Sequence, residues 1–300
     1  MQFQKNFLLK DYNTWKVGGA ADWCVRPSTQ AEVQEAVNWG CDRQLPITVL
    51  SGGSNSLISD LGIEGLVILL DQFRGISHLQ VENNTLSCEV LSGTPKSELL
   101  KVFVKHRLSP ALFLAGLPGD VGGGVVMNAG VGHDIEPKEF KEIVEWFEYI
   151  PFAEPQNIIR KTTNQIKWVY RNTQGWGPGV ITRVGIRWSE EPQEDLLQRL
   201  QASNKRRMSS QPLQWPSCGS TFKNPTGDKA GRLIDLCGLK KFRIGGAEVS
   251  DLHANFIINC GEATTQDILH VVHHVQQTVF DKYGIQLETE FKFLGRPHKE

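Results

Sequence analysis

Residues 113–132 read FLAGLPGDVGGGVVMNAGVG, and this stretch decides the fold. Seven glycines in twenty residues are too many for a regular element, so we expect a loop that fits closely against something else. A shorter glycine loop, Ser-Gly-Gly-Ser-Asn, occupies 51–55 directly after an apolar run. Loops of this kind can aim successive backbone N–H groups at one phosphate. Tight turns explain most single glycine clusters, but two in one half of the chain favour ligand binding.

Neither loop matches the nucleotide-binding motifs of other common folds. The P-loop pattern Gly-x-x-x-x-Gly-Lys-Ser/Thr is absent, and no Gly-x-Gly-x-x-Gly follows a strand. A glycine loop after a strand, with a long second one further along, resembles the arrangement by which vanillyl-alcohol-oxidase-like flavoproteins hold the FAD pyrophosphate.

Periodicity and turn residues indicate alternating helices and strands around the two loops. Thr29 and Glu32 form a capping-box pattern, and Thr264 with Asp267 offers a second helix start. We expect helices at 29–44, after Pro95, through 196–200 and at 266–282, and strands at 46–50, 66–70, 85–90, 143–149, 180–188 and 254–259.

Composition excludes several classes of protein. The chain has 32 Lys+Arg against 33 Asp+Glu and no strongly basic segment, so we expect no nucleic-acid partner. The N-terminus lacks the apolar run of a signal peptide and no stretch could span a membrane, which predicts a cytoplasmic protein without membrane contact.

The six cysteines are scattered, and we expect them reduced. His270, His273 and His274 share a helical face without an evident further ligand, so we expect no metal.

A series of further motifs is ordered as in one known family. They are Asn13-Thr14-Trp15-Lys16-Val17-Gly18-Gly19, Gly52-Gly53-Ser54-Asn55, Pro118-Gly119-Asp120-Val121-Gly122-Gly123, Asn128-Ala129-Gly130, Tyr170-Arg171-Asn172-Thr173, the segments 211–225 and 230–235, Gly245 to Ser250, His253 to Asn259 and Gly284 to Glu290. With these motifs the chain resembles, end to end, the UDP-N-acetylenolpyruvoylglucosamine reductase (MurB) family of peptidoglycan precursor synthesis. About nine residues separate Arg171 from the expected strand at Val180, which is similar to the shorter, type II branch.

The resemblance implies an α+β fold with two domains. Residues 1–190 would form a two-subdomain FAD-binding domain of the vanillyl-alcohol-oxidase (PCMH) type, split near 75–90, and 191–300 a smaller α+β substrate-binding domain. The implied reaction is an NADPH-dependent, FAD-mediated reduction of UDP-N-acetylglucosamine enolpyruvate to UDP-N-acetylmuramate. The implied partners are small molecules, and we expect a monomer.

The resemblance also assigns residues. Arg171 and Glu290 would flank the substrate carboxylate, and Ser220 would be the general acid. Glu288, on the same strand face, is the rival to Glu290. The implied FAD contacts are Thr14, Ser51, Gly52, Gly53, Ser54, Asn55, Ser56, Pro118, Gly119, Val121, Gly122, Gly123, Asn128 and Gly130. The implied substrate contacts are Tyr170, Lys223 and Asn224, while Lys205, Arg206 and Arg207 either meet the diphosphate or end a solvated helix.

Three positions depart from the family pattern. Asp120 replaces a small hydroxyl residue beside the flavin phosphates, Gly124 replaces alanine, and Val131 replaces tyrosine. We expect the Asp120 carboxylate to point away from the phosphates, because like charges repel there. Two other functions stay open at this point: an FAD oxidase with a different small substrate, and a flavin- or nucleotide-binding protein without turnover.

Overall fold

The computed structural model of the chain describes residues 1–132 and 135–297. It divides into two compact units, each assembled from separate stretches of sequence. Unit 1 comprises Met1–Gln4, Cys24–Gly52 and Gly65–Lys205, and unit 2 comprises Lys5–Trp23, Gly53–Glu64 and Arg206–Glu300. These units group the chain by contact and differ from the domain boundary expected near residue 190, which stays a prediction.

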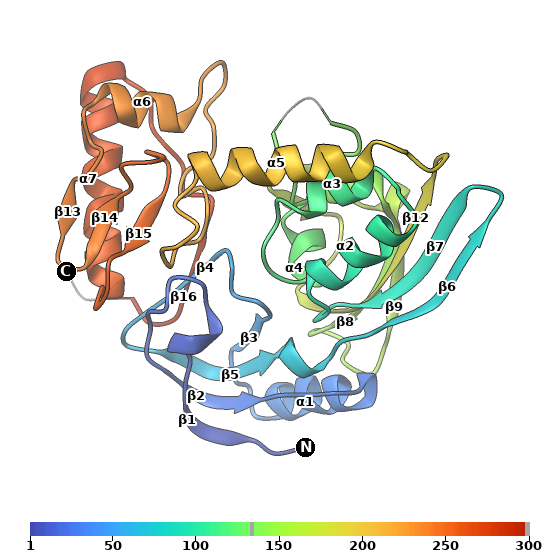
Figure 1. Ribbon diagram of the computed structural model, residues 1–300. Coiled ribbons are helices and arrows are strands. Elements are labelled where there is room, and N and C mark those ends of the chain that lie inside the picture. Colours follow the sequence, from blue (N-terminus) through green and yellow to red (C-terminus); the bar gives the residue numbers. More distant parts are fainter. Residues whose placement is uncertain (133–134, 298–300) are drawn as a thin grey trace. The chain divides into compact units, whose positions relative to one another are not determined.

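Unit 1 contains an antiparallel five-stranded sheet of order β6-β7-β12-β8-β9 (Figure 1). Along β7 buried and half-buried residues alternate, so one face of the strand lies in the core. The strands expected at 85–90, 143–149 and 180–188 are confirmed as β7, β8 and β12. The bounds are β6 Ile76–Glu82, β7 Thr85–Leu91, β8 Val144–Pro151, β9 Ile159–Thr162 and β12 Gly179–Ser189.

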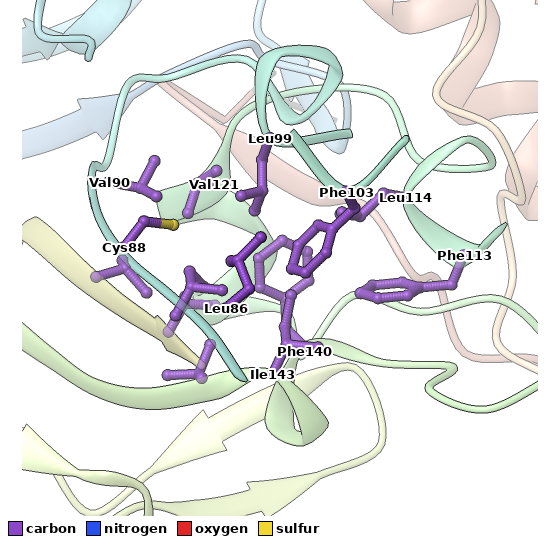
Figure 2. Close-up of a cluster of buried hydrophobic side chains, with 14 of the residues drawn as sticks. Leu86, Cys88, Val90, Leu99, Phe103, Phe113, Leu114, Val121, Phe140 and Ile143 are labelled. Atoms are coloured by element: carbon purple, nitrogen blue, oxygen red, sulfur yellow. The ribbon is translucent and has the colours of Figure 1, made fainter. Parts of the chain in front are cut away.

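Helices supply the other half of this core. Figure 2 shows Phe103 and Phe113 among the side chains of β7, and the Phe113 ring meets Phe140 edge to face at 5.9 Å. Leu196 and Leu200 of α5 join the same cluster. The helices are α2 Lys96–Lys105, α3 Pro110–Leu114, α4 Val121–Val126 and α5 Leu196–Ser210, the last of which runs past the boundary at Lys205.

The expectation of an unbroken loop over 113–132 is wrong, because α4 forms inside it. Val121 and Val125 are buried in the Figure 2 core, and this packing outweighs the low helix propensity of three glycines. A β-carbon on Gly124 would lie 2.5 Å from Cζ of Phe140, and one on Gly122 would lie 2.7 Å from Cβ of Ser92. Glycine is therefore required here by close packing, which also explains why Gly124 cannot be alanine without a shift of Phe140.

The first glycine loop follows a short parallel strand pair. β3 (Ile47–Leu50) pairs with β5 (Ile63–Leu69), and the loop begins where β3 ends. Helix α1 (Gln30–Asp42) starts at the predicted capping box, in which Thr29 and Glu32 bond reciprocally. β5 and β2 (Ala20–Val25) each start in unit 2 and end in unit 1, within a sheet of order β1-β2-β5-β3 whose first strand is Gln4–Leu8.

Unit 2 is centred on the long helix α7, Thr265–Tyr283, which begins at the predicted Thr264–Asp267 capping box. Val271, Val275 and Val279 of α7 are buried in a cluster that includes Trp15. α6 (Ala230–Leu236) adds to this cluster, and the antiparallel sheet β13-β14-β15 lies beside α7 (Figure 1). The strands are β13 Arg243–Ile244, β14 Ala247–Val249 and β15 Ile257–Asn259, with a separate parallel pair of β4 Ser56–Ile58 and β16 Lys292–Leu294.

The remaining elements are short. β10 (Lys167–Val169) and β11 (Asn172–Gln174) form an antiparallel hairpin in unit 1. Single 3-10 turns lie at Lys10–Tyr12, Leu70–Gln72, Phe140–Glu142 and Thr163–Gln165. Within residues 1–132 and 135–297, no helix is both long enough and apolar enough to cross a bilayer.

Candidate active site

Ser220 and Glu290 lie on two hydrogen-bonded segments of unit 2. The N–H of Glu290 donates to the carbonyl of Thr221 at 2.8 Å, and the N–H of Lys223 donates to the carbonyl of Glu288 at 2.9 Å. These bonds flank an antiparallel bridge between Phe222 and Thr289. The two segments lie more than sixty positions apart in the sequence and are aligned by these bonds. Ser220 directly precedes Thr221, the residue that bonds to Glu290.

The side chain of Asn255 clamps the Ser220 loop from its other side. Its Oδ1 accepts the N–H of Phe222 at 2.9 Å, and its Nδ2 donates to the carbonyl of Phe222 at 2.8 Å. The backbone carbonyl of Asn255 also accepts the N–H of Thr221 at 2.8 Å. Asn255 is 4% exposed, so these bonds are shielded from water. Asn255 belongs to one of the sequence motifs. Nothing in the neighbouring sequence, however, indicates that its side chain would bond both backbone groups of Phe222, as a paired strand would.

Gly219 makes the turn into Ser220, with a φ of +82° that favours glycine. Ser220 itself is half-buried, whereas Cys218 is buried two residues earlier. Burial raises the pKa of the Cys218 thiol, and the charge of Glu290 acts in the same direction. Cys218 is consequently a neutral packing residue, and the role of Ser220 as a proton donor stays a prediction.

The part of the first glycine loop that belongs to unit 2 meets the Glu290 strand. Nδ2 of Asn55 donates to the carbonyl of Glu290 at 3.0 Å, and the N–H of Lys292 donates to the carbonyl of Asn55 at 2.9 Å. The N–H of Thr14 donates to the carbonyl of Gly53 at 3.4 Å. Oγ1 of Thr14 is buried and makes no hydrogen bond among the described residues.

Glu290, the predicted catalytic carboxyl group, and Glu288, its rival, differ in their surroundings. The side chain of Glu288 is 73% exposed and forms an ion pair of 3.0 Å with Lys223. Glu290 is half-buried beside Asn55. Lys223 is therefore neutralised by Glu288, and Oδ1 of Asn224 accepts the N–H of Ala230 at the start of α6. Both predicted substrate residues thus have structural partners within unit 2.

Arg171 lies in unit 1, at the tip of the β10–β11 hairpin. Val169 pairs with Asn172, so Tyr170 and Arg171 form a two-residue turn. Arg171 has a φ of +57°, an unfavourable conformation for a side chain of this size, and such strain often marks a functional site. Its guanidinium donates to the carbonyl of Gly130 at 2.9 Å and lies 4.8 Å from the Tyr170 ring. The position of Arg171 relative to Ser220 and Glu290 stays a prediction.

The hairpin is attached to the second half of the glycine-rich stretch. Nδ2 of Asn128 donates to a carboxylate oxygen of Glu139 at 3.0 Å and to the carbonyl of Val169 at 3.4 Å. Oγ1 of Thr173 donates to the carbonyl of Val126 at 3.2 Å. Asn128 is 1% exposed, and its φ of +38° is in the left-handed region that asparagine tolerates. Asn128 and Gly130 therefore orient Arg171, besides their predicted contact with the cofactor.

The two glycine loops touch within unit 1. A β-carbon on Gly52 would lie 2.9 Å from Cα of Gly119, so the loops approach at backbone distance. Oγ of Ser51 donates to Oδ2 of Asp120 at 2.6 Å, and the backbone of Gly52 also hydrogen-bonds this carboxylate. The Asp120 carboxylate thus lies against the predicted phosphate loop, and its direction relative to the phosphates stays a prediction. The buried Lys96 lies nearby, with Nζ donating to the carbonyl of Pro118 at 2.7 Å.

These features fit a dinucleotide cofactor. The backbones of the glycine loops are in contact within unit 1, and no described atom lies within 4 Å of a β-carbon placed on Gly123. Glycine-rich backbone of this kind can approach a phosphate closely and bind it. His274 stacks on Phe242 at 4.0 Å. Among the described residues, no group of three or more His, Cys, Asp or Glu side chains is placed to hold a metal ion.

Comparisons with known proteins agree with this interpretation. Residues 21–151 match the model of an FAD-binding domain, and residues 211–294 match the C-terminal domain of UDP-N-acetylenolpyruvoylglucosamine reductase. The reductase of that name from Synechococcus sp. (strain CC9605) is 38% identical over 298 residues, which is 97% of this chain and 95% of the relative. Another from Limosilactobacillus fermentum is 36% identical, over 99% of this chain and 95% of the relative.

A solved structure extends the similarity to three dimensions. The MurB reductase from Thermus caldophilus has a TM-score of 0.80 at 33% identity and covers 98% of this chain and 99% of its own. The fold and the matched models define an FAD-dependent oxidoreductase with an α+β architecture. The chain belongs to the UDP-N-acetylenolpyruvoylglucosamine reductase family. The predicted family, fold class, oxidoreductase activity and FAD and NADPH cofactors are confirmed.

Proposed function

We propose that this chain reduces the enolpyruvyl group of UDP-N-acetylglucosamine enolpyruvate to give UDP-N-acetylmuramate, with NADPH as reductant. The observation that carries the proposal is the register that holds Ser220 and Glu290 in paired segments, with Asn55 of the first glycine loop bonded to Glu290. A proton donor, a carboxyl group and a cofactor loop are thereby built into one framework.

The cofactor contacts follow from the two glycine loops. Backbone N–H groups of both loops bind the FAD pyrophosphate, and the unpaired Thr14 hydroxyl adds a polar contact. When bound, FAD takes hydride from NADPH and delivers it to the substrate. The residues proposed for this task are Thr14, Ser51, Gly52, Gly53, Ser54, Asn55, Ser56, Pro118, Gly119, Val121, Gly122, Gly123, Asn128 and Gly130.

The chain's own side chains handle the charge and the proton. Addition of hydride to the CH2 carbon leaves negative charge on the adjacent carbon and its carboxylate. Arg171 binds that carboxylate, for which its planar guanidinium is well shaped, and Glu290 supports the enol-like intermediate. Ser220 then gives its hydroxyl proton to the adjacent carbon. Tyr170, Lys223 and Asn224 contact the sugar nucleotide.

The cellular setting follows from the same reaction. The substrate and NADPH are soluble small molecules of the cytoplasm, so we place the enzyme there, without a nucleic-acid or membrane partner. We propose a monomer, because the assigned residues all come from one chain.

The half-reactions test this proposal. Ser220→Ala leaves reduction of the bound flavin by NADPH nearly unchanged, and slows its reoxidation by the enolpyruvyl nucleotide by about 10³-fold, in the range of lost general acid catalysis. Anaerobic stopped-flow absorbance of the flavin measures each step separately. Ser209→Ala, which removes an exposed hydroxyl from α5, is the control and reacts as the wild type does. Equal losses of rate in both half-reactions refute the role of Ser220.

A further inference from the structure

Asp120 places a carboxylate between the two loops that are proposed to bind a diphosphate. It accepts a hydrogen bond of 2.6 Å from Oγ of Ser51 and another from the backbone of Gly52. A β-carbon on Gly52 would lie 3.2 Å and 3.3 Å from the two carboxylate oxygens, so the acid lies directly against the loop. Asp120 is 9% exposed and immediately precedes α4. The donors that an anion would use are thus already engaged by an anion of the protein.

Charged groups of both signs surround Asp120. Lys96 of α2 attracts the carboxylate, whereas Asp71, which lies in the turn after β5 and pairs with Arg26, repels it. Lys96 is itself buried, donates to the carbonyl of Pro118 and lies 5.7 Å from the centre of the Phe140 ring. The pKa of Lys96 is lowered to about 8, chiefly by burial. Asp120 raises this pKa, whereas Arg171 lowers it. Burial raises the pKa of Asp120 against the opposing effects of Ser51, Lys96 and Gly52.

We infer that Asp120 is an internal anion that competes with the FAD pyrophosphate for the Ser51–Gly52 donors and so lowers the affinity of the chain for its cofactor. The inference rests on the proposed role of the glycine loops. A diphosphate carries two negative charges, and in a site with little water each unit of like charge within a few ångströms weakens binding substantially. Binding of FAD is then weakened for as long as the carboxylate occupies these donors.

A mutation can remove the charge of Asp120 and keep the shape of its side chain. Asp120→Asn keeps the volume and one acceptor oxygen for Ser51, but removes the negative charge. We expect the dissociation constant for FAD to fall by at least about tenfold, equivalent to about 1.4 kcal/mol.

The test is a titration of the apoprotein with FAD at constant ionic strength and about pH 7, followed by quenching of flavin fluorescence. Glu148→Gln is the matched control, since Glu148 is 15% exposed in unit 1 and pairs with Arg160 on the outer strands of the sheet. Asp120→Ser, which is smaller and also neutral, repeats the test if the asparagine variant does not fold.

The outcomes separate the inference from the proposed function. Tighter binding by a neutral Asp120 variant, with Glu148→Gln unchanged, supports the inference. A dissociation constant equal to or greater than that of the wild type overturns it and leaves the proposed function in place. Absence of FAD binding by the wild type overturns both.

Discussion

Replacement of Asn255 by alanine tests how the catalytic loop is held. The substitution removes both partners of Phe222, so a buried N–H and a buried carbonyl lose hydrogen bonds of 2.9 Å and 2.8 Å. Each unpaired buried polar group costs about 1–3 kcal/mol. The Glu290–Thr221 and Lys223–Glu288 bonds keep the opposite side of the loop in place. We therefore expect the free energy of local opening at Phe222 to fall by about 3 kcal/mol, which is in the lower half of the range for two such groups.

Hydrogen exchange measures this loss where it occurs. About 3 kcal/mol corresponds to a protection factor about 10²-fold lower for the peptide that contains Phe222. Exchange followed by mass spectrometry reports this peptide apart from the rest of the chain. The same variant reoxidises more slowly with the enolpyruvyl nucleotide, because Ser220 lies two residues before Phe222, while reduction by NADPH is retained.

The control for this experiment is Asn157→Ala. Asn157 donates to Glu154 at an exposed site of unit 1, and its loss changes protection of the Phe222 peptide by less than twofold. If the Asn255 variant also keeps protection within about threefold of the wild type, equivalent to less than about 1 kcal/mol, the clamp is not what orders this loop.

Two further predictions concern the core beneath the glycine loops. Lys96→Met abolishes the rise in the free energy of unfolding that the wild type shows from about pH 8 to pH 10.5, because across that window the unfolded wild type binds a proton that the folded wild type releases; urea denaturation at several pH values measures it, and an equal rise in the variant contradicts it. Gly124→Ala lowers the free energy of unfolding by about 1–3 kcal/mol through its clash with Phe140, whereas Gly123→Ala, which meets nothing within 4 Å, is neutral or stabilising in the same denaturation assay; equal effects would refute the packing argument.

Local chemistry in the sequence was sufficient for several of the regular elements. The capping boxes at Thr29 and Thr264 placed the starts of α1 and α7, and alternation at 85–90 placed β7. These signals involve residues a few positions apart, which is the range over which propensity and capping act. The prediction of an unbroken loop over 113–132 was wrong for the opposite reason. Helix α4 depends on the burial of Val121 and Val125 in a core formed by distant residues.

The candidate site was predictable by residue type more than by geometry. The family motifs contained Ser220, Glu290 and Arg171, yet the two-residue turn at Tyr170–Arg171 contains no glycine and gave no hairpin signal. The clamp by Asn255 and the turn of Asp120 toward Ser51 are long-range contacts. Such contacts depend on the packed backbone, and no pattern within either segment specifies them.

The parallel pairing of β16 with β4 has a consequence for the order in which the enzyme matures. Lys292 bonds to Asn55, and Glu290 accepts from the Asn55 side chain, so the last strand supports a loop made more than two hundred residues earlier. Synthesis proceeds from the N-terminus, so the ribosome makes this strand long after the loop that it supports. The first glycine loop therefore gains these hydrogen bonds only after β16 has been synthesised, and its final form depends on a distant, later part of the chain.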